Sequence, residues 1–185
     1  MNIPSQEKCF ELIKQMKMMS HIIDHSIMVA NVAFFLSQKL KPKFPELNIE
    51  LVTNAALLHD ITKTRSFDTK EQHAETGGEL LTQLGYSETG DIIRQHVILD
   101  TYNMNTAIAE QEIVNYSDKR VLHDNVVLLE KRLAYIKSKY GNQKGFKERI
   151  KSVWADTRNL EKKIFSYLDI DPEQLSQHIE KKIKK

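Results

Sequence analysis

NAALLHDITKT, residues 54–64, reads as the end of a buried helix in which a histidine and an aspartate stand side by side. The run 55–58 and Ile61 are apolar, so the segment is expected to lie in a core. Burying an imidazole beside a carboxylate costs free energy unless each group finds a partner. His59 and Asp60 therefore predict a partner that this stretch does not itself supply.

Two further polar residues are expected on apolar helix faces. His25 is followed by apolar residues at i+3, i+4 and i+7, and Asp118 lies one turn beyond Val114. Alone, such a histidine is more often a hydrogen-bonded core residue, and such an aspartate is usually exposed. Together with the pair 59–60 they make a nitrogen and oxygen set that divalent metals favour.

Helical spacing of apolar residues runs through almost the whole chain, and the strand-like alternation of a sheet is scarce. We therefore expect an all-α protein. The expected helices cover residues 5–19, 21–40, 49–60, 73–85, 87–97, 107–121, 125–140 and 146–167, with a last helix from Pro172 into the basic end EKKIKK. Residues 65–72 and 98–105 are expected loops, and the basic end is expected to be a solvated, fraying terminus.

The length of 185 residues suits one domain with a substantial core. Six of the seven histidines precede residue 141, and the remainder is charged and amphipathic. We expect residues 1–141 to form the functional domain and residues 142–185 to be a helical extension packed on it.

Composition narrows the class of protein. A net charge of +2 gives no indication of a nucleic-acid partner, and the single cysteine, Cys9, cannot form an internal disulfide. The apolar runs are too short to span a bilayer, and no signal peptide is visible. We expect a cytoplasmic protein with no membrane partner.

The order His25, then His59 and Asp60, then Asp118 resembles the HD superfamily of metal-dependent phosphohydrolases. HDITK at 59–63 is similar to the HDIGK form of the central motif, with Thr62 where glycine often stands. The preceding AALL and the later H-x-x-x-GG extend the resemblance, which covers residues 20–125. It implies an HD-domain helical bundle in a small stand-alone, bacterial-type protein.

The resemblance also implies a metal centre with one or two ions. It assigns these ligands to a first ion: His25, His59, Asp60 and Asp118. In the two-metal subgroups, which include symmetrical dinucleoside tetraphosphate hydrolases and HD-GYP phosphodiesterases, histidines in the intervals of His73 and His96 bind a second ion that the aspartate bridges. Histidine-rich sets favour Fe, Mn, Ni, Co or Zn over Mg.

Other histidines leave alternatives open. His21 is spaced i, i+4 from His25, so it is either an alternative ligand or a residue at the rim of the site. His123 and Asp124 repeat the dipeptide, but an apolar run follows, and Asp124 is placed to cap the helix expected from residue 125. His73 opens a helix after a loop, where a merely exposed side chain is the alternative.

The implied function is a phosphohydrolase that cleaves a phosphate ester or anhydride of a nucleotide or similar phosphorylated small molecule. A bound metal makes hydroxide available near neutral pH, and the resemblance gives Asp60 and Lys63 catalytic roles. The expected substrate-binding residues are Lys63, Arg65, Arg94 and Arg120. Lys119 and Arg120 have the alternative of pairing with helix carboxyl ends.

Two other functions remain open from the residues. One is a diiron oxygenase, because some HD relatives use a similar iron pair with oxygen. The other is a regulatory module that binds a nucleotide without hydrolysis. The apolar stripe Leu129, Leu133 and Ile136 is expected in the core, with a cover over the metal site or a homodimer face as the alternatives. Trp154 is expected in a core or interface.

Overall fold

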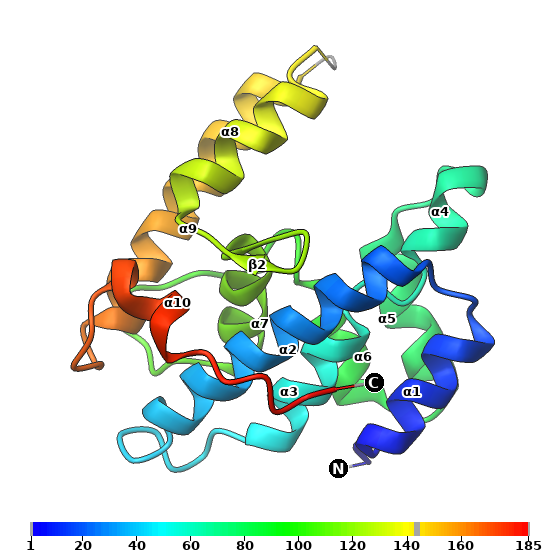
Figure 1. Cartoon of the computed structure of the whole chain (residues 1–185), viewed down its shortest axis with the longest axis horizontal. Helices are drawn as coiled ribbons and strands as arrows, with labels where there is room; N and C mark the ends of the chain where they lie inside the picture. Colours follow the sequence, from blue (N-terminus) through cyan, green and yellow to red (C-terminus); the bar gives the residue numbers. More distant parts are fainter. Residues whose placement is uncertain (1, 143–144, 185) are drawn as a thin grey trace.

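The computed structural model describes residues 2–142 and 145–184, except the side chains of residues 146–149, and the fold is mostly helical, as expected (Figure 1). The elements are α1 (Gln6–Gln15), α2 (Ser20–Leu40), α3 (Ile49–Leu58), α4 (Lys63–Thr69), α5 (His73–Gln83), α6 (Ser87–Arg94), α7 (Glu110–Lys119), β1 (Val121–Leu122), β2 (Asn125–Val126), α8 (Leu129–Tyr140), α9 (Phe146–Phe165), the 3-10 turn η1 (Pro172–Gln174) and α10 (Leu175–His178). Within the part of the chain described, no helix combines the length and apolar character needed to cross a membrane.

The centre of the bundle is formed by α2 and α3, which pack on each other. Asn48 begins α3, where its side-chain oxygen accepts a hydrogen bond from the N–H of Leu51. Every residue from 51 to 62 is buried, which explains why the apolar residues of this stretch are not confined to one helix face. The helix ends at Leu58, and two tight turns follow it. His59 and Asp60 are thereby held in the interior, outside the regular helix.

Helices α5 and α6 approach each other through glycines. A methyl group added at Gly90 would lie 2.6 Å from the carbonyl oxygen of Gly78 and 2.7 Å from the hydroxyl of Thr82. The sequence motif that follows His73 thus has a packing role, because small residues let the neighbouring helix come close. This packing fixes the first residue of α5 relative to the end of α6.

Substituting Gly90 with alanine is expected to destabilise the protein by about 1–2 kcal/mol. Overpacking against a backbone carbonyl costs about 1–3 kcal/mol, whereas the better helix propensity of alanine returns at most about 1 kcal/mol. Urea denaturation measures the difference. Gly77→Ala is the control, because its added methyl group would meet a movable side-chain atom of Ile93 at 3.2 Å and should cost less. Equal stability of Gly90→Ala and the parent protein would contradict this packing.

Three expectations about local structure are wrong. Residues 65–69, expected in a loop, belong to α4, a short helix that buries none of its residues and so carries no apolar period. Residues 121, 125 and 126 were expected in helices, but residues 121–126 form the β1–β2 hairpin, whose strands are too short to show the alternation of a sheet. Asp124 lies in the turn of that hairpin and caps no helix, since α8 begins only at Leu129. Missing tertiary context explains all three errors.

The C-terminal end also differs from expectation. The last helix ends at His178, and the chain beyond it runs along α2. The side-chain oxygen of Asn31 accepts hydrogen bonds from the N–H groups of Lys182 and Ile183, and its amide donates to the carbonyl of Ile183. Ile183 is buried. The predicted fraying terminus is therefore anchored at residues 182–183.

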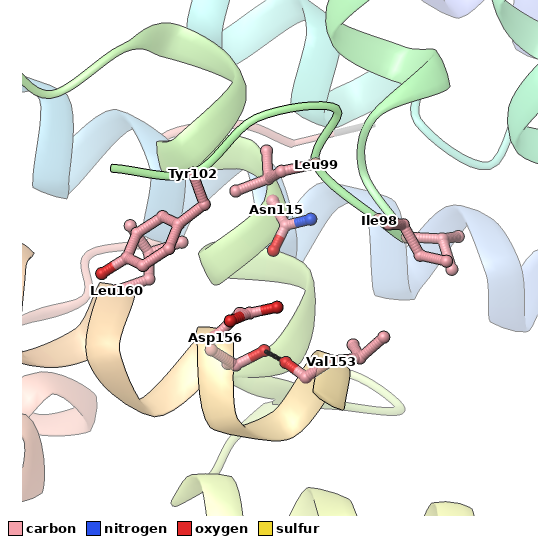
Figure 2. Close-up of a pocket in the computed structure, with 9 residues that line it drawn as sticks. Ile98, Leu99, Tyr102, Asn115, Val153, Asp156 and Leu160 are labelled. Atoms are coloured by element: carbon pink, nitrogen blue, oxygen red, sulfur yellow. Dashed lines mark hydrogen bonds between the residues drawn. The ribbon is translucent and has the colours of Figure 1, made fainter. Parts of the chain in front are cut away.

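Helix α9 packs on α7 and, together with α8, extends away from the main bundle (Figure 1). Trp154 is buried, as expected for a core residue. Figure 2 shows Leu99 and Tyr102, from the segment between α6 and α7, near Leu160 of α9 around a cavity of about 40 Å³. The division between residues 1–141 and 142–185 stays a prediction, and Gln143 and Lys144 lie outside the described residues.

Candidate metal centre

Six side chains with metal-ligating groups converge from separate parts of the chain. The helix α2 contributes one, the turn after α3 two, the start of α5 one, the turn after α6 one and the end of α7 one. In that order they are His25, His59, Asp60, His73, His96 and Asp118. The structure therefore brings together every residue that the resemblance assigned as a ligand, although their role as ligands stays a proposal.

One group of ligand atoms gathers around Asp118. Its Oδ1 lies 3.0 Å from Nε2 of His25 and 3.7 Å from Nε2 of His59. The potential ligand atoms of these three residues all lie within 4.8 Å of one another. That spacing is compact enough for all three to reach one cation.

A second group gathers around Asp60. Its Oδ1 lies 3.2 Å from Nε2 of His73 and 3.6 Å from Nε2 of His96, while its Oδ2 lies 3.4 Å from Nε2 of His59. The atoms of His59, Asp60 and His96 again lie within 4.8 Å of one another. Because His59 belongs to both groups and Asp60 lies next to the first, the arrangement can accommodate one ion or an adjacent pair.

Backbone carbonyls orient three of the imidazoles. Nδ1 of His25 donates to the carbonyl of His123 at 2.8 Å, that of His59 to Ala56 at 2.7 Å and that of His96 to Ile93 at 2.7 Å. A carbonyl can only accept, so each of these Nδ1 atoms carries a proton, and Nε2 is the ring nitrogen that faces the cluster. This is the arrangement that outer hydrogen bonds impose on metal-ligating histidines.

Two buried atoms in this cluster lack hydrogen-bond partners. Nε2 of His59 and Oδ1 of Asp60 are inaccessible to solvent, and neither hydrogen-bonds to any described residue. Buried polar atoms are normally satisfied, and both atoms belong to residues whose potential ligand atoms gather with that of His96 within 4.8 Å of one another. A divalent cation would satisfy both, so the residues present fit a metal.

The electrostatics of the cluster favour a cation. Burial alone would raise the pKa of Asp60, but Lys63 and His59 outweigh it and hold that pKa well below its usual value. The pKa of Asp118 is likewise lowered, by His25 and Arg132 against the opposing effect of burial. Burial and the neighbouring His59 lower the pKa of His96 to about 3. Two ionised carboxylates and a neutral imidazole are the protonation states that metal binding requires.

Lysines hold two parts of the centre in place. Nζ of Lys63 lies 2.7 Å from Oδ2 of Asp60, beside the cluster. Lys119 is buried, and its ammonium donates to the carbonyls of His96 and Asn115 and to the side-chain oxygen of Asn115. The buried amide of Asn115 also donates to the carbonyl of Gln95. Lys119 therefore fixes the backbone of a candidate ligand and has no donor directed at a substrate.

The arginines expected to bind substrate lie elsewhere. Arg65 pairs with Glu71, and Arg94 pairs with Asp91 and Asp100. Arg120 is almost fully buried, where it donates to the hydroxyl of Tyr116, to Glu161 and to the carbonyls of Val127 and Pro172. None of the three lines the cavity over the candidate ligands. Their contacts link parts of the fold and leave these guanidinium groups outside the cavity.

A groove of about 560 Å³ lies over the cluster, and we call it the metal-site groove. Its floor includes five of the six candidate ligands, His59 being covered, and its walls come from α2, α4, α8 and the segment after α6. His21 lines it, as a rim position would require, and so does His123. Sequence reasoning missed Arg132 and Tyr135, which α8 contributes. Arg132 lies between the apolar positions Leu129 and Leu133, and Tyr135 lies between Leu133 and Ile136. Both placements are ordinary in any amphipathic helix, so the sequence alone does not single these residues out.

Fold and site define a helical domain with a buried histidine and aspartate centre suited to divalent metal. The family model described as HD domain matches residues 22–169. The chain belongs to this family, whose members bind divalent metals and generally act as hydrolases of phosphorylated substrates.

Individual relatives agree with this assignment. An uncharacterized protein of Methanocaldococcus jannaschii is 29% identical over 147 residues, which cover 69% of this chain and 85% of the relative. Ribonuclease Y of Rubrobacter xylanophilus is 31% identical over 74 residues, and that of Petrotoga mobilis is 36% identical over 64. Those stretches cover 40% and 35% of this chain, but only 13% and 11% of the ribonucleases. No solved structure matches the chain significantly.

Proposed function

We propose that this protein is a metal-dependent phosphohydrolase that cleaves a phosphorylated small molecule, with a nucleotide among the candidate substrates. The ligands we propose are His25, His59, Asp60, His73, His96 and Asp118, binding one or two transition-metal ions. The observation that carries the proposal is the pair of unsatisfied buried atoms, Nε2 of His59 and Oδ1 of Asp60, at the centre of this cluster.

The residues of the proposed centre have different roles in hydrolysis. A bound divalent metal makes hydroxide available near neutral pH and polarises phosphoryl oxygens. The carbonyl hydrogen bonds keep the imidazoles aimed at the centre, so little reorganisation is needed on binding. Asp60 holds the middle of the cluster, and the Lys63 ammonium at its edge offsets negative charge on a phosphoryl group.

Metal reconstitution with a substrate panel tests the proposed function. The metal-free protein is loaded separately with Mn, Fe, Co, Ni, Zn or Mg, and phosphate or nucleotide release is followed from phosphomonoesters, cyclic nucleotides and dinucleoside polyphosphates. We expect hydrolysis that requires added metal and is supported better by a transition metal than by Mg. Absence of hydrolysis with every metal and substrate would contradict the proposal, and oxygen consumption by the iron form alone would favour the oxygenase alternative.

A further inference from the structure

One face of α8 forms a wall of the metal-site groove. The residues that line the groove from this helix follow the spacing i, i+3, i+4, i+7 and i+8, and therefore share one face. They are Arg132, Tyr135, Ile136, Lys139 and Tyr140, which we call the α8 wall. At a rise of about 1.5 Å per residue, this wall extends about 12 Å along the groove. Its N-terminal end lies at the candidate metal centre and its C-terminal end lies away from it.

Arg132 is the member of the wall nearest the metal centre. Its guanidinium Nη2 lies 3.6 Å from Oδ1 of Asp118, which is too long for a hydrogen bond. Its Nε is buried and makes no hydrogen bond to the described residues. The side chain is 14% exposed. A partly buried guanidinium that lines a groove and lies too far from Asp118 for a hydrogen bond is suited to bind an anionic acceptor such as a phosphoryl oxygen.

The outer part of the groove is unusually apolar for a surface. Phe67, Val97, Ile98 and Tyr140 all line it, and they are 45%, 39%, 52% and 38% exposed. They come from α4, the segment after α6, and the end of α8, and α4 and α8 project on the same side of the bundle (Figure 1). Clustered apolar exposure around a concave site marks a ligand-binding surface.

Positive and negative side chains are distributed differently along the groove. Its described lining contains the cations Lys63, Arg132 and Lys139, whereas its carboxylates are Asp60 and Asp118, both candidate metal ligands. Lys139 lies 5.7 Å from the ring centre of Tyr135, whose ring in turn contacts that of His123. Beyond the metal centre the groove therefore offers aromatic faces and positive charge, the combination on which nucleobases stack.

We propose that the α8 wall selects phosphate monoesters whose leaving group carries an aromatic ring of nucleobase size. This inference rests on the proposed function. Arg132 binds the phosphoryl group at the metal centre, and Tyr135 together with Ile98 holds the ring. In the reaction, water adds to phosphorus, the phosphorus–oxygen ester bond breaks, and the released alcohol takes up a proton from the attacking water. The small polar leaving groups of sugar phosphates would not contact the apolar outer part of the groove, so these compounds should be poorer substrates.

Adenosine 5′-monophosphate and ribose 5-phosphate are a matched pair of substrates, because they share the 5′ phosphate ester and differ in the base. We expect the parent protein, loaded with its best metal, to favour the nucleotide by about 10-fold or more in kcat/KM, the size of effect that base stacking supplies. Tyr135→Ala and Ile98→Ser should remove most of that preference by lowering kcat/KM for the nucleotide alone.

Arg132→Ala should lower kcat/KM for both substrates by about 10- to 100-fold, as expected for loss of a hydrogen bond to a charged group. Arg132→Lys should recover part of that loss. Binding of inorganic phosphate to the metal-loaded protein, measured by calorimetry, should weaken in parallel, while metal content stays that of the parent. Arg158→Ala, an exposed arginine of α9 outside the groove, is the control and should change none of these values.

The outcomes separate this inference from the proposed function. Equal kcat/KM for the two compounds, or hydrolysis only of other substrates in the panel, would overturn the α8 wall as a selector and leave a phosphohydrolase. Unchanged phosphate binding in Arg132→Ala would overturn the role of Arg132. Absence of hydrolysis of any compound would overturn both proposals.

Discussion

Replacing Asp60 with alanine is expected to remove bound metal and abolish hydrolysis. Both carboxylate oxygens of Asp60 face histidine Nε2 atoms. Among the described residues, Asp60 is the only carboxylate that lies within 4.0 Å of His73 or His96. Loss of a residue that merely orients a ligand typically costs 10- to 100-fold in metal affinity, so loss of a central ligand should cost more than about 100-fold. Elemental analysis of purified protein and metal titration of the metal-free form measure the effect.

Asp124 provides a matched control for that experiment. It follows His123 in a second His-Asp dipeptide, but it is exposed in the turn of the β1–β2 hairpin. Asp124→Ala should keep the metal content and activity of the parent protein. If Asp60→Ala retained as much metal as Asp124→Ala, Asp60 would not be a ligand.

Replacing Lys163 with methionine is expected to lower the free energy of unfolding by about 3–5 kcal/mol, the usual cost of leaving one buried charge without its partner. Nζ of Lys163 lies 2.7 and 2.9 Å from the two carboxylate oxygens of Glu112, and both side chains are buried. The same ammonium donates to the carbonyls of Asn103 and Ala107. Urea denaturation followed by circular dichroism gives the change in stability.

Two further variants show whether the pair itself is responsible. Lys162 is the adjacent exposed lysine of α9, and Lys162→Met should change stability little. Adding Glu112→Gln to Lys163→Met should recover part of the loss, because the unpaired buried charge is then removed. Equal stability of the Lys162 and Lys163 variants would show that the ion pair does not hold α9 to α7.

The sequence predicted the helical class and the approximate position of most helices, because an apolar period marks any helix that buries one face. The prediction failed for segments that bury too few residues to show a periodic apolar pattern. Helix α4 buries none of its residues, and the β1–β2 hairpin has two residues in each strand. The segment after His178 is fixed by Asn31, which is about 150 residues away in the chain. The amino-acid pattern of the C-terminal segment alone cannot predict a contact with so distant a residue.

The sequence predicted the candidate metal ligands of the site better than its basic residues, again because contacts distant in the chain are not visible in the sequence. Polar residues on apolar helix faces indicate His25, His59, Asp60 and Asp118, and the resemblance adds His73 and His96. The structure brings all six together. For the basic residues the sequence offers only their proximity along the chain to the candidate ligands. Arg94 and Arg120 have that proximity and yet lie outside the groove, whereas Arg132 reaches it from α8. The position of α8 depends on the hairpin before it and on its packing against α9, and neither can be read from residues 129–140 alone.

The central claim is that these six side chains form a metal centre, and anomalous X-ray scattering from crystals of the manganese-loaded protein tests it most directly. We expect a manganese peak within coordination distance of both Nε2 of His59 and Oδ1 of Asp60, the two buried atoms without hydrogen-bond partners among the described residues. A second peak beside Asp118 or His73 would indicate a two-metal centre. Manganese bound only at other positions, or no peak at the cluster in fully loaded crystals, would show that these six side chains do not form a metal centre.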